Sequence, residues 1–195
     1  MRVGPVSVAW AEARSPAVRL SAVDQARAAA YPAQRRARFT TGRALLAELV
    51  AERFPGAVGW EVTTGPCPRC GGLHGAVTLS GLPALASLSY ADAMVVAAVA
   101  SLDDLSRLGV DAERDDPEVA RSADLAGLLG CDPQVSLHRW TQVEAVVKAD
   151  GRGLLLDPAA VNFDAGSAWI DDDPTPYCVA DVSGPAGYLV TLAWR

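Results

Sequence analysis

The hydrophobic and polar positions of the first half of the chain alternate between the period of a strand and that of a helix. They predict a strand over Val6–Trp10, a helix over Ala22–Ala30, and a second helix that starts at Thr40-Thr41, where either side chain can cap it. The apolar stripe of this second helix comprises Leu45, Leu46, Leu49 and Val50. A loop is expected over residues 65–83, which are rich in Gly, Pro and Cys.

The rest of the chain mixes the same two periods. It opens with a predicted hairpin of Ser87–Tyr90 and Met94–Ala100 around Ala91-Asp92, followed by a strand over Leu108–Glu113. The later elements are helices over Pro117–Leu129 and Gln134–Ala149, ended by Gly130 and Gly151, and strands around 154–156, 161–163, 167–170, 176–182 and 187–194. This mixture predicts an α+β protein.

Length and composition fit a soluble globular protein. The chain has 195 residues, half of them hydrophobic, which is enough for one core or for two small halves. No apolar run approaches the ~20 residues that cross a bilayer. The N-terminus lacks the pattern of a signal peptide, so the expected location is the cytoplasm, with no membrane partner.

The net charge of −6 hides an asymmetry between the halves. Residues 1–98 carry ten Arg against six acids, a net of +4, whereas residues 99–195 carry seven cations against seventeen acids, a net of −10. An acidic protein is a poor candidate for nucleic-acid binding, which depends on a basic surface. A cleft between the halves would suit a phosphate-rich small molecule on one wall and a metal on the other.

Two acidic patterns suggest that metal. Asp111 and Glu113 lie two apart on a predicted strand and share a face, while Glu144 and Lys148 lie four apart on a predicted helix and share a face. Carboxylates that converge repel one another unless a cation lies between them, and a hard divalent ion is the natural partner. Mg²⁺ is favoured where phosphates share its coordination.

The cationic residues are unusual because sixteen of the seventeen are Arg, and Lys148 is the only Lys. One interpretation is that its compact charge is used at a site; the other is an ordinary solvated Glu144–Lys148 helix pair. Arg43 is expected in the first turn of its helix, where backbone donors favour anions. With Arg35, Arg36 and Arg38 it forms a candidate phosphate wall, the alternative being a solvated basic helix end.

Four cysteines in a reducing compartment are expected to be free or metal-bound. Cys67 and Cys70, with His74 nearby, supply three of the four ligands that structural zinc requires. The alternative is a Gly-rich loop with two thiols that leads to a nucleotide site. His138 is expected to be a packing or surface residue.

These motifs resemble the signature of the 4′-phosphopantetheinyl transferases, of the larger, single-chain type that activates surfactin synthetase. The matching segments are Gly109-Val-Asp-Ala-Glu113, Trp140-x-x-x-Glu144-x-x-x-Lys148 and Gly151-Arg-Gly-Leu, with Arg35-Arg36, Phe39, Gly42-Arg43, Ser87-Leu-Ser89, Tyr177 and Gly187-Tyr188 as further points of similarity. The resemblance covers nearly the whole chain.

The resemblance implies two pseudo-twofold-related halves, residues 1–98 and 99–195, that meet around coenzyme A and Mg²⁺, with Mn²⁺ as another acceptable ion. It implies transfer of the phosphopantetheine arm to a serine of an apo acyl or peptidyl carrier protein, with release of 3′,5′-adenosine bisphosphate. Two halves in one chain suggest a monomer. The implied metal ligands are Asp111, Glu113 and Glu144; the implied catalytic residues are Glu144, Lys148 and Asp111; and the implied coenzyme-binding residues are Arg36, Arg43, Ser89, Tyr90 and Lys148.

In this scheme Glu144 is the general base for the carrier serine, and a nearby Mg²⁺ lowers its pKa. Lys148 neutralises the pyrophosphate. Three family cations are replaced here by Tyr90, Ala76 and Val143, which predicts a weaker hold on the nucleotide, partly offset by Arg36, Arg43 and Arg69. Two alternatives follow: a weakened homologue that binds a carrier protein or nucleotide without transfer, and, more distantly, a small zinc-loop binding module.

Overall fold

The α+β class predicted from the sequence is confirmed. The computed structural model describes residues 1–72, 75–115 and 119–195 and combines helices with antiparallel sheets. The elements of the first half are β1 (Arg2–Val3), β2 (Val6–Glu12), α1 (Ala22–Ala30), α2 (Ala33–Arg53), β3 (Glu61–Thr64), β4 (Val77–Ser80), β5 (Ala84–Ala91) and β6 (Met94–Ser101). Those of the second half are β7 (Leu108–Arg114), α3 (Val119–Leu129), α4 (Pro133–Asp150), the 3-10 turns Gly153–Leu155 and Pro158–Ala160, β8 (Val161–Asp164), β9 (Ser167–Ile170), β10 (Asp173–Asp181) and β11 (Tyr188–Trp194).

The two halves repeat one order of elements. Apart from the two-residue strand β1, each runs from a strand through two helices to four further strands. In the first half β2 pairs antiparallel with β6, as β7 does with β11 in the second. The strand orders are β1-β2-β6-β5 in one sheet and β7-β11-β10-β9-β8 in the other, with β3 and β4 as a separate hairpin. The sheets therefore divide between β6 and β7, whereas residue 98 lies inside β6.

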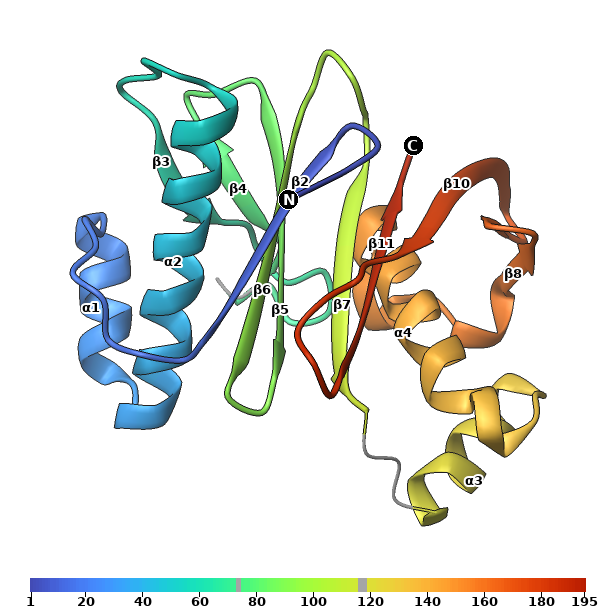
Figure 1. Cartoon of the computed structure of the whole chain (residues 1–195). Helices are drawn as coiled ribbons and strands as arrows, with labels where there is room; N and C mark the ends of the chain where they lie inside the picture. The colour runs from blue at the N-terminus through green and yellow to red at the C-terminus, as the bar shows by residue number, and fades with distance from the viewer. Residues whose placement is uncertain (73–74, 116–118) are drawn as a thin grey trace.

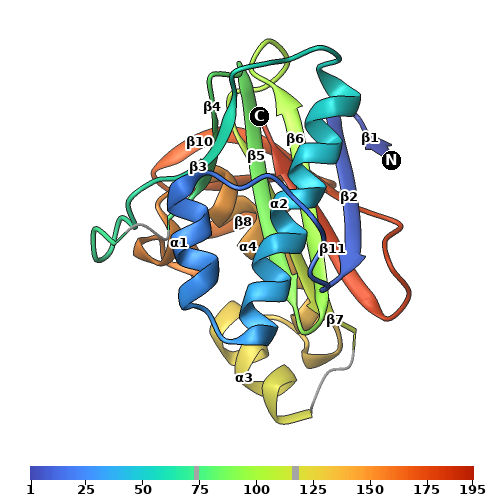
Figure 2. The ribbon, with the colours of Figure 1, turned by 90° about the vertical axis from the view of Figure 1, so that its left-hand side faces the viewer.

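The elements stack in four layers, with α2 outside one sheet and α4 outside the other (Figure 1). The predicted stripe of α2 is buried against one face of β6, at Val95, Ala97 and Val99. The opposite face of β6, including Val96 and Ala98, shares a core with Val110 and Leu192 of the second sheet. Because β6 is covered on both faces, every one of its residues is buried. Figure 2 shows α2 lying over the first sheet with α1 beside it.

The sheets meet along a seam between β5 and β7. Ser87 and Ser89, which share one face of β5, accept hydrogen bonds from the backbone N–H groups of Val110 and Ala112 at 3.0 and 3.1 Å. Both serines are buried. Side-chain oxygens thus satisfy backbone donors on the edge of β7 that would otherwise be buried without a partner.

This seam predicts a measurable cost for removing one hydroxyl. In Ser87→Ala the buried N–H of Val110 loses its acceptor, and the free energy of unfolding should fall by about 1–3 kcal/mol. Ser80→Ala removes an exposed hydroxyl and should change it by less than about 0.5 kcal/mol. Urea denaturation of both variants measures the difference, and equal midpoints would contradict the role of the seam.

Three local expectations were wrong. The second helix begins at Ala33 after Pro32, so Thr40 and Thr41 lie inside it, where Thr40 Oγ1 donates to the Arg36 carbonyl at 3.0 Å. Residues 65–83 contain the strand β4, and residues 154–156 fall mainly in a 3-10 turn instead of a strand.

None of the described helices is both long and apolar enough to cross a bilayer.

Candidate functional site

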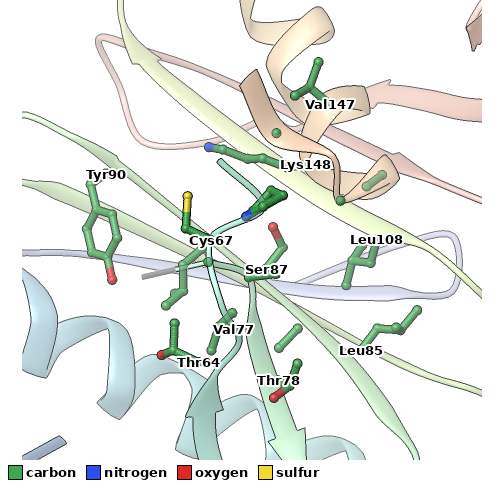
Figure 3. Close-up of a pocket in the computed structure, with 18 of the residues that line it drawn as sticks. Thr64, Cys67, Val77, Thr78, Leu85, Ser87, Tyr90, Leu108, Val147 and Lys148 are labelled. Atoms are coloured by element: carbon green, nitrogen blue, oxygen red, sulfur yellow. The ribbon is translucent and has the colours of Figure 1, made fainter. Parts of the chain in front are cut away.

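A large cavity of about 1170 Å³ opens between the two halves (Figure 3). Its walls come from α1, α2, β5, the segment around β3 and β4, and the C-terminal end of α4. Seven cationic side chains line it: Arg27, Arg35, Arg38, Arg43, Arg69, Arg107 and Lys148. Within the described residues no Asp or Glu lines the cavity. In a protein of net charge −6 this lining selects for anions.

A buried ion pair holds part of the basic wall in place. Arg43 Nε donates to Asp24 Oδ2 at 2.6 Å, and both residues are at most 4% exposed. Arg27 Nη1 donates to Thr64 Oγ1 at 2.8 Å and lies 3.5 Å from Asp24 Oδ1. Arg43 lies in the middle of α2, not in its first turn as expected from the sequence, because the helix starts earlier. Its charge is largely neutralised by Asp24.

The arginines expected to form a phosphate wall do not all lie at the cavity, because Arg36 is not among its lining residues. Arg35 and Arg38 line the cavity, three residues apart on one face of α2. Arg36 is exposed, is not among the lining residues, and donates to the Tyr31 carbonyl at 3.4 Å. The correction follows from the helical period, because α2 is continuous through these positions and turns neighbouring side chains to different sides.

Tyr90 lines the cavity with its hydroxyl against α2. A methyl group on Gly42 would lie 2.9 Å from that oxygen, so the glycine makes room for it. The residue is 41% exposed, but burial of its hydroxyl end raises the pKa of the phenol, against the opposing effect of Arg43. Tyr90 is therefore a neutral hydrogen-bond donor at physiological pH.

Lys148 connects the two halves at the edge of the cavity. Its Nζ donates to Asp111 Oδ1 at 2.5 Å and to Ser89 Oγ at 3.0 Å. Ser89 Oγ in turn donates to Asp111 Oδ1 at 2.9 Å. Ser89 does not line the cavity, so in this structure it positions Lys148 and Asp111 and is not itself exposed to a ligand.

Close packing of α4 on β7 brings these groups together. Gly109 lies so near α4 that a Cβ there would be 2.0 Å from the Ala145 carbonyl oxygen and 2.6 Å from the Ala149 nitrogen. Gly109 and Asp111 lie two apart on β7 and therefore share one face of the strand. The absent side chain at 109 therefore lets the helix carrying Glu144 and Lys148 reach Asp111.

The three predicted carboxylates are electrostatically coupled. Burial raises the pKa of Glu144, Lys148 lowers it, and the charges of Asp111 and Glu113 raise it further. In the protein alone this pKa is thus raised, opposite to the lowering expected with a metal present.

The donor set fits a hard divalent cation by its chemistry, because Asp111 Oδ2 is buried and has no hydrogen-bond partner in the described structure. The carboxylate side chains are not preorganised as a metal site in this structure. Among the described residues no three His, Cys, Asp or Glu side chains are grouped so as to hold a metal ion. Asp111 is neutralised by Lys148 instead.

Of the three ligands in the zinc interpretation, His74 lies outside the described residues. Cys67 and Cys70 line the cavity and are not joined in a disulfide. His138 is a surface residue, as expected, and its Nε2 lies 2.8 Å from Asp181 Oδ2.

Two cationic residues of the cavity were not identified from the sequence. Arg27 comes from α1, and Arg107 precedes β7 with its guanidinium bonded to the Asp150 carbonyl at 3.2 Å. Neither stands in a motif, and only the folded arrangement places them at the cavity.

A scan against models of protein families found no match to this chain. A search of curated proteins likewise found none.

Proposed function

We propose that this protein is a Mg²⁺-dependent 4′-phosphopantetheinyl transferase that moves the phosphopantetheine arm of coenzyme A to a serine of an apo carrier protein. The observation that carries the proposal is a large cavity whose described lining residues include seven cations and no carboxylate, bordered at Lys148 by the Asp111–Glu113–Glu144 group. The cavity suits a ligand with several phosphates, and the carboxylates suit a cation beside them.

Coenzyme A matches both the size and the charge of the cavity. At about 1170 Å³ the volume lies just above the ~300–1,000 Å³ of ordinary ligand pockets, and coenzyme A is a large ligand. The arginines are distributed over both halves, from Arg27 on α1 to Arg107 before β7, and can neutralise phosphates along an extended molecule. This distribution supports the proposal that these arginines supply the positive charge lost where Tyr90, Ala76 and Val143 replace cations of the family.

The transfer forms a phosphoester bond to the carrier serine and breaks the phosphoanhydride bond of coenzyme A. The carrier serine oxygen attacks the phosphorus that bears the pantetheine arm, the bond to the second phosphate breaks, and 3′,5′-adenosine bisphosphate leaves. The serine proton goes to a Glu144 carboxylate oxygen. Burial raises the pKa of Glu144 in the protein alone, and a bound Mg²⁺ would lower it, which keeps the carboxylate ionised and able to accept the proton.

Lys148 neutralises charge on the departing phosphate, and Ser89 fixes its ammonium. Asp111, Glu113 and Glu144 are the residues that would hold Mg²⁺, which when bound stabilises negative charge on the pyrophosphate.

The repeated element order supports the pseudo-twofold arrangement of the proposed family. Both sets of groups, the basic wall and the carboxylates, come from one chain, so a single copy completes the site and a monomer is sufficient. The positive first half also provides a surface for an acidic acyl or peptidyl carrier.

The test is a mass measurement of the carrier. The protein is incubated with coenzyme A, Mg²⁺ and apo acyl or peptidyl carrier proteins, and each carrier is then weighed. A gain equal to the phosphopantetheine arm supports the proposal. No gain on several carriers, with coenzyme A binding retained, would favour the homologue that binds without transfer.

The different positions of Arg35 and Arg36 relative to the cavity provide a matched pair of variants. Arg35→Ala removes a cation from the cavity and should weaken coenzyme A binding roughly fivefold, about 1 kcal/mol for one partly solvated charge. Arg36→Ala removes the same charge one residue away and should leave the dissociation constant within twofold, roughly the effect of a screened charge. Isothermal titration at moderate salt measures both, and equal losses would contradict the placement of Arg35.

A further inference from the structure

The wall of the cavity also holds a pair of thiols. Cys67 and Cys70 both line it, from the segment that joins β3 to β4. Figure 3 shows the Cys67 sulfur among the lining side chains. Cys67 is half-buried and Cys70 is exposed, so solutes can reach the pair. Neither sulfur has a part in the proposed transfer.

A tight turn brings the two thiols together. The Gly71 N–H donates to the Cys67 carbonyl at 2.8 Å, and the Cys67 N–H donates to the Gly72 carbonyl at 2.7 Å. Gly71 has φ +72°, which closes the turn. Residues three apart in such a helical turn face the same side. The side chain of Cys70 is hydrogen-bonded to the Cys67 sulfur.

The turn also favours the thiolate of Cys67. Backbone N–H groups of Arg69 and Cys70 point at its sulfur and, with the Cys70 thiol and the Arg69 charge, lower its pKa against the effect of desolvation. The thiolate is the nucleophile in thiol–disulfide exchange. Cys131 and Cys178 lie elsewhere in the fold, between α3 and α4 and in β10, and serve as internal references.

We propose that Cys67 and Cys70 form a redox-active dithiol in the cavity wall, which a low-molecular-weight disulfide oxidises to an intramolecular disulfide. The Cys67 thiolate attacks one sulfur of the small disulfide, forms a mixed disulfide and releases one thiolate. Cys70 then loses its proton, attacks the Cys67 sulfur and releases the second small thiol. Two electrons pass to the small molecule, which leaves as two thiols, and one sulfur–sulfur bond forms in the protein.

Oxidation would fix the residue 67–70 turn at the cavity wall, beside Arg69. This is a modification site that goes beyond the proposed transfer and does not depend on it, because every step occurs between sulfur atoms. Reduction by a thiol reverses the oxidation, so the oxidation state of the Cys67–Cys70 pair responds to the redox state of the surroundings.

The test uses glutathione disulfide on the full-length protein, with mass spectrometry of intact protein and peptides. The wild type should lose two hydrogens through a bond joining Cys67 to Cys70. Cys70→Ser should stop at a glutathione adduct on Cys67, whereas Cys67→Ser should form no intramolecular bond. Iodoacetamide should alkylate Cys67 several-fold faster than Cys178. The Cys131→Ser, Cys178→Ser double variant should behave as the wild type.

Three outcomes would overturn the proposal. They are stable glutathione adducts with no intramolecular bond in the wild type, alkylation of Cys67 no faster than that of Cys178, and stoichiometric zinc in the purified protein that Cys67→Ser abolishes. The first two would show ordinary thiols, and the third would show a metal site. None of these readouts requires coenzyme A or a carrier, so failure here is separable from failure of the proposed transfer.

Discussion

Replacing Glu144 by Gln is expected to reduce phosphopantetheine transfer by about 10²–10⁴-fold while leaving the fold intact. The amide keeps the shape of the side chain but cannot accept the serine proton. Burial raises the pKa of Glu144, so its charged form is disfavoured in the folded protein, and a neutral Gln should not lower the free energy of unfolding. The rate is measured as holo-carrier formed per unit time, and stability by thermal unfolding.

Glu48→Gln is the matched control, because Glu48 lies on α2 and not among the cavity residues. It should transfer at the wild-type rate. Full activity in Glu144→Gln would remove Glu144 from the role of base, and a large loss of stability in that variant would show that its effect on rate is structural.

Gly109→Ala is expected to lower the free energy of unfolding by about 3 kcal/mol, at the upper end of the usual cost of overpacking. The new methyl would lie 2.0 Å from the Ala145 carbonyl oxygen, and that neighbour is backbone of α4, which cannot turn aside as a side chain can. The helix must move off β7, taking Lys148 away from Asp111. Both stability and transfer should therefore fall, as chemical denaturation and the carrier assay would measure.

Gly127→Ala supplies the matched control for this substitution. Gly127 lies inside α3, is exposed, and a Cβ there meets no atom within 4 Å. The substitution should raise the free energy of unfolding by about 0.4–1 kcal/mol, because it reduces the freedom of the unfolded chain. A Gly109→Ala protein as stable as the wild type would contradict the close approach of α4 to β7.

Hydrophobic periodicity predicted most of the fold because most elements bury one face. The helix Ala22–Ala30 and the strand Ser167–Ile170 were predicted with the bounds the structure gives them. The start of α2 was missed because the polar segment before Thr40 has no apolar stripe, and Pro32 marks the start instead. The four-residue strands β3 and β4 were missed because each depends on the other for pairing.

The parts of the candidate site that depend on residue spacing within one strand or one helix were predicted from the sequence. The shared face of Asp111 and Glu113 and the approach of Lys148 to Asp111 were predicted from the periods of strand and helix. The contact of Lys148 with Ser89 in the first half was not predicted. The Asp24–Arg43 ion pair and the contributions of Arg27 and Arg107 depend on how distant segments meet, which no local pattern records.

The serine seam has a consequence for the behaviour of the chain in concentrated solution. Unpaired strand edges are templates for adding strands from other molecules, and they promote aggregation. Here β5 and β7, edges of their own sheets, face each other through Ser87 and Ser89 inside the molecule. The outer edge of the second sheet is formed by β8, which has only four residues and is too short to recruit another chain effectively. The seam between β5 and β7, which positions Lys148, thus also keeps these two strand edges from pairing with other molecules.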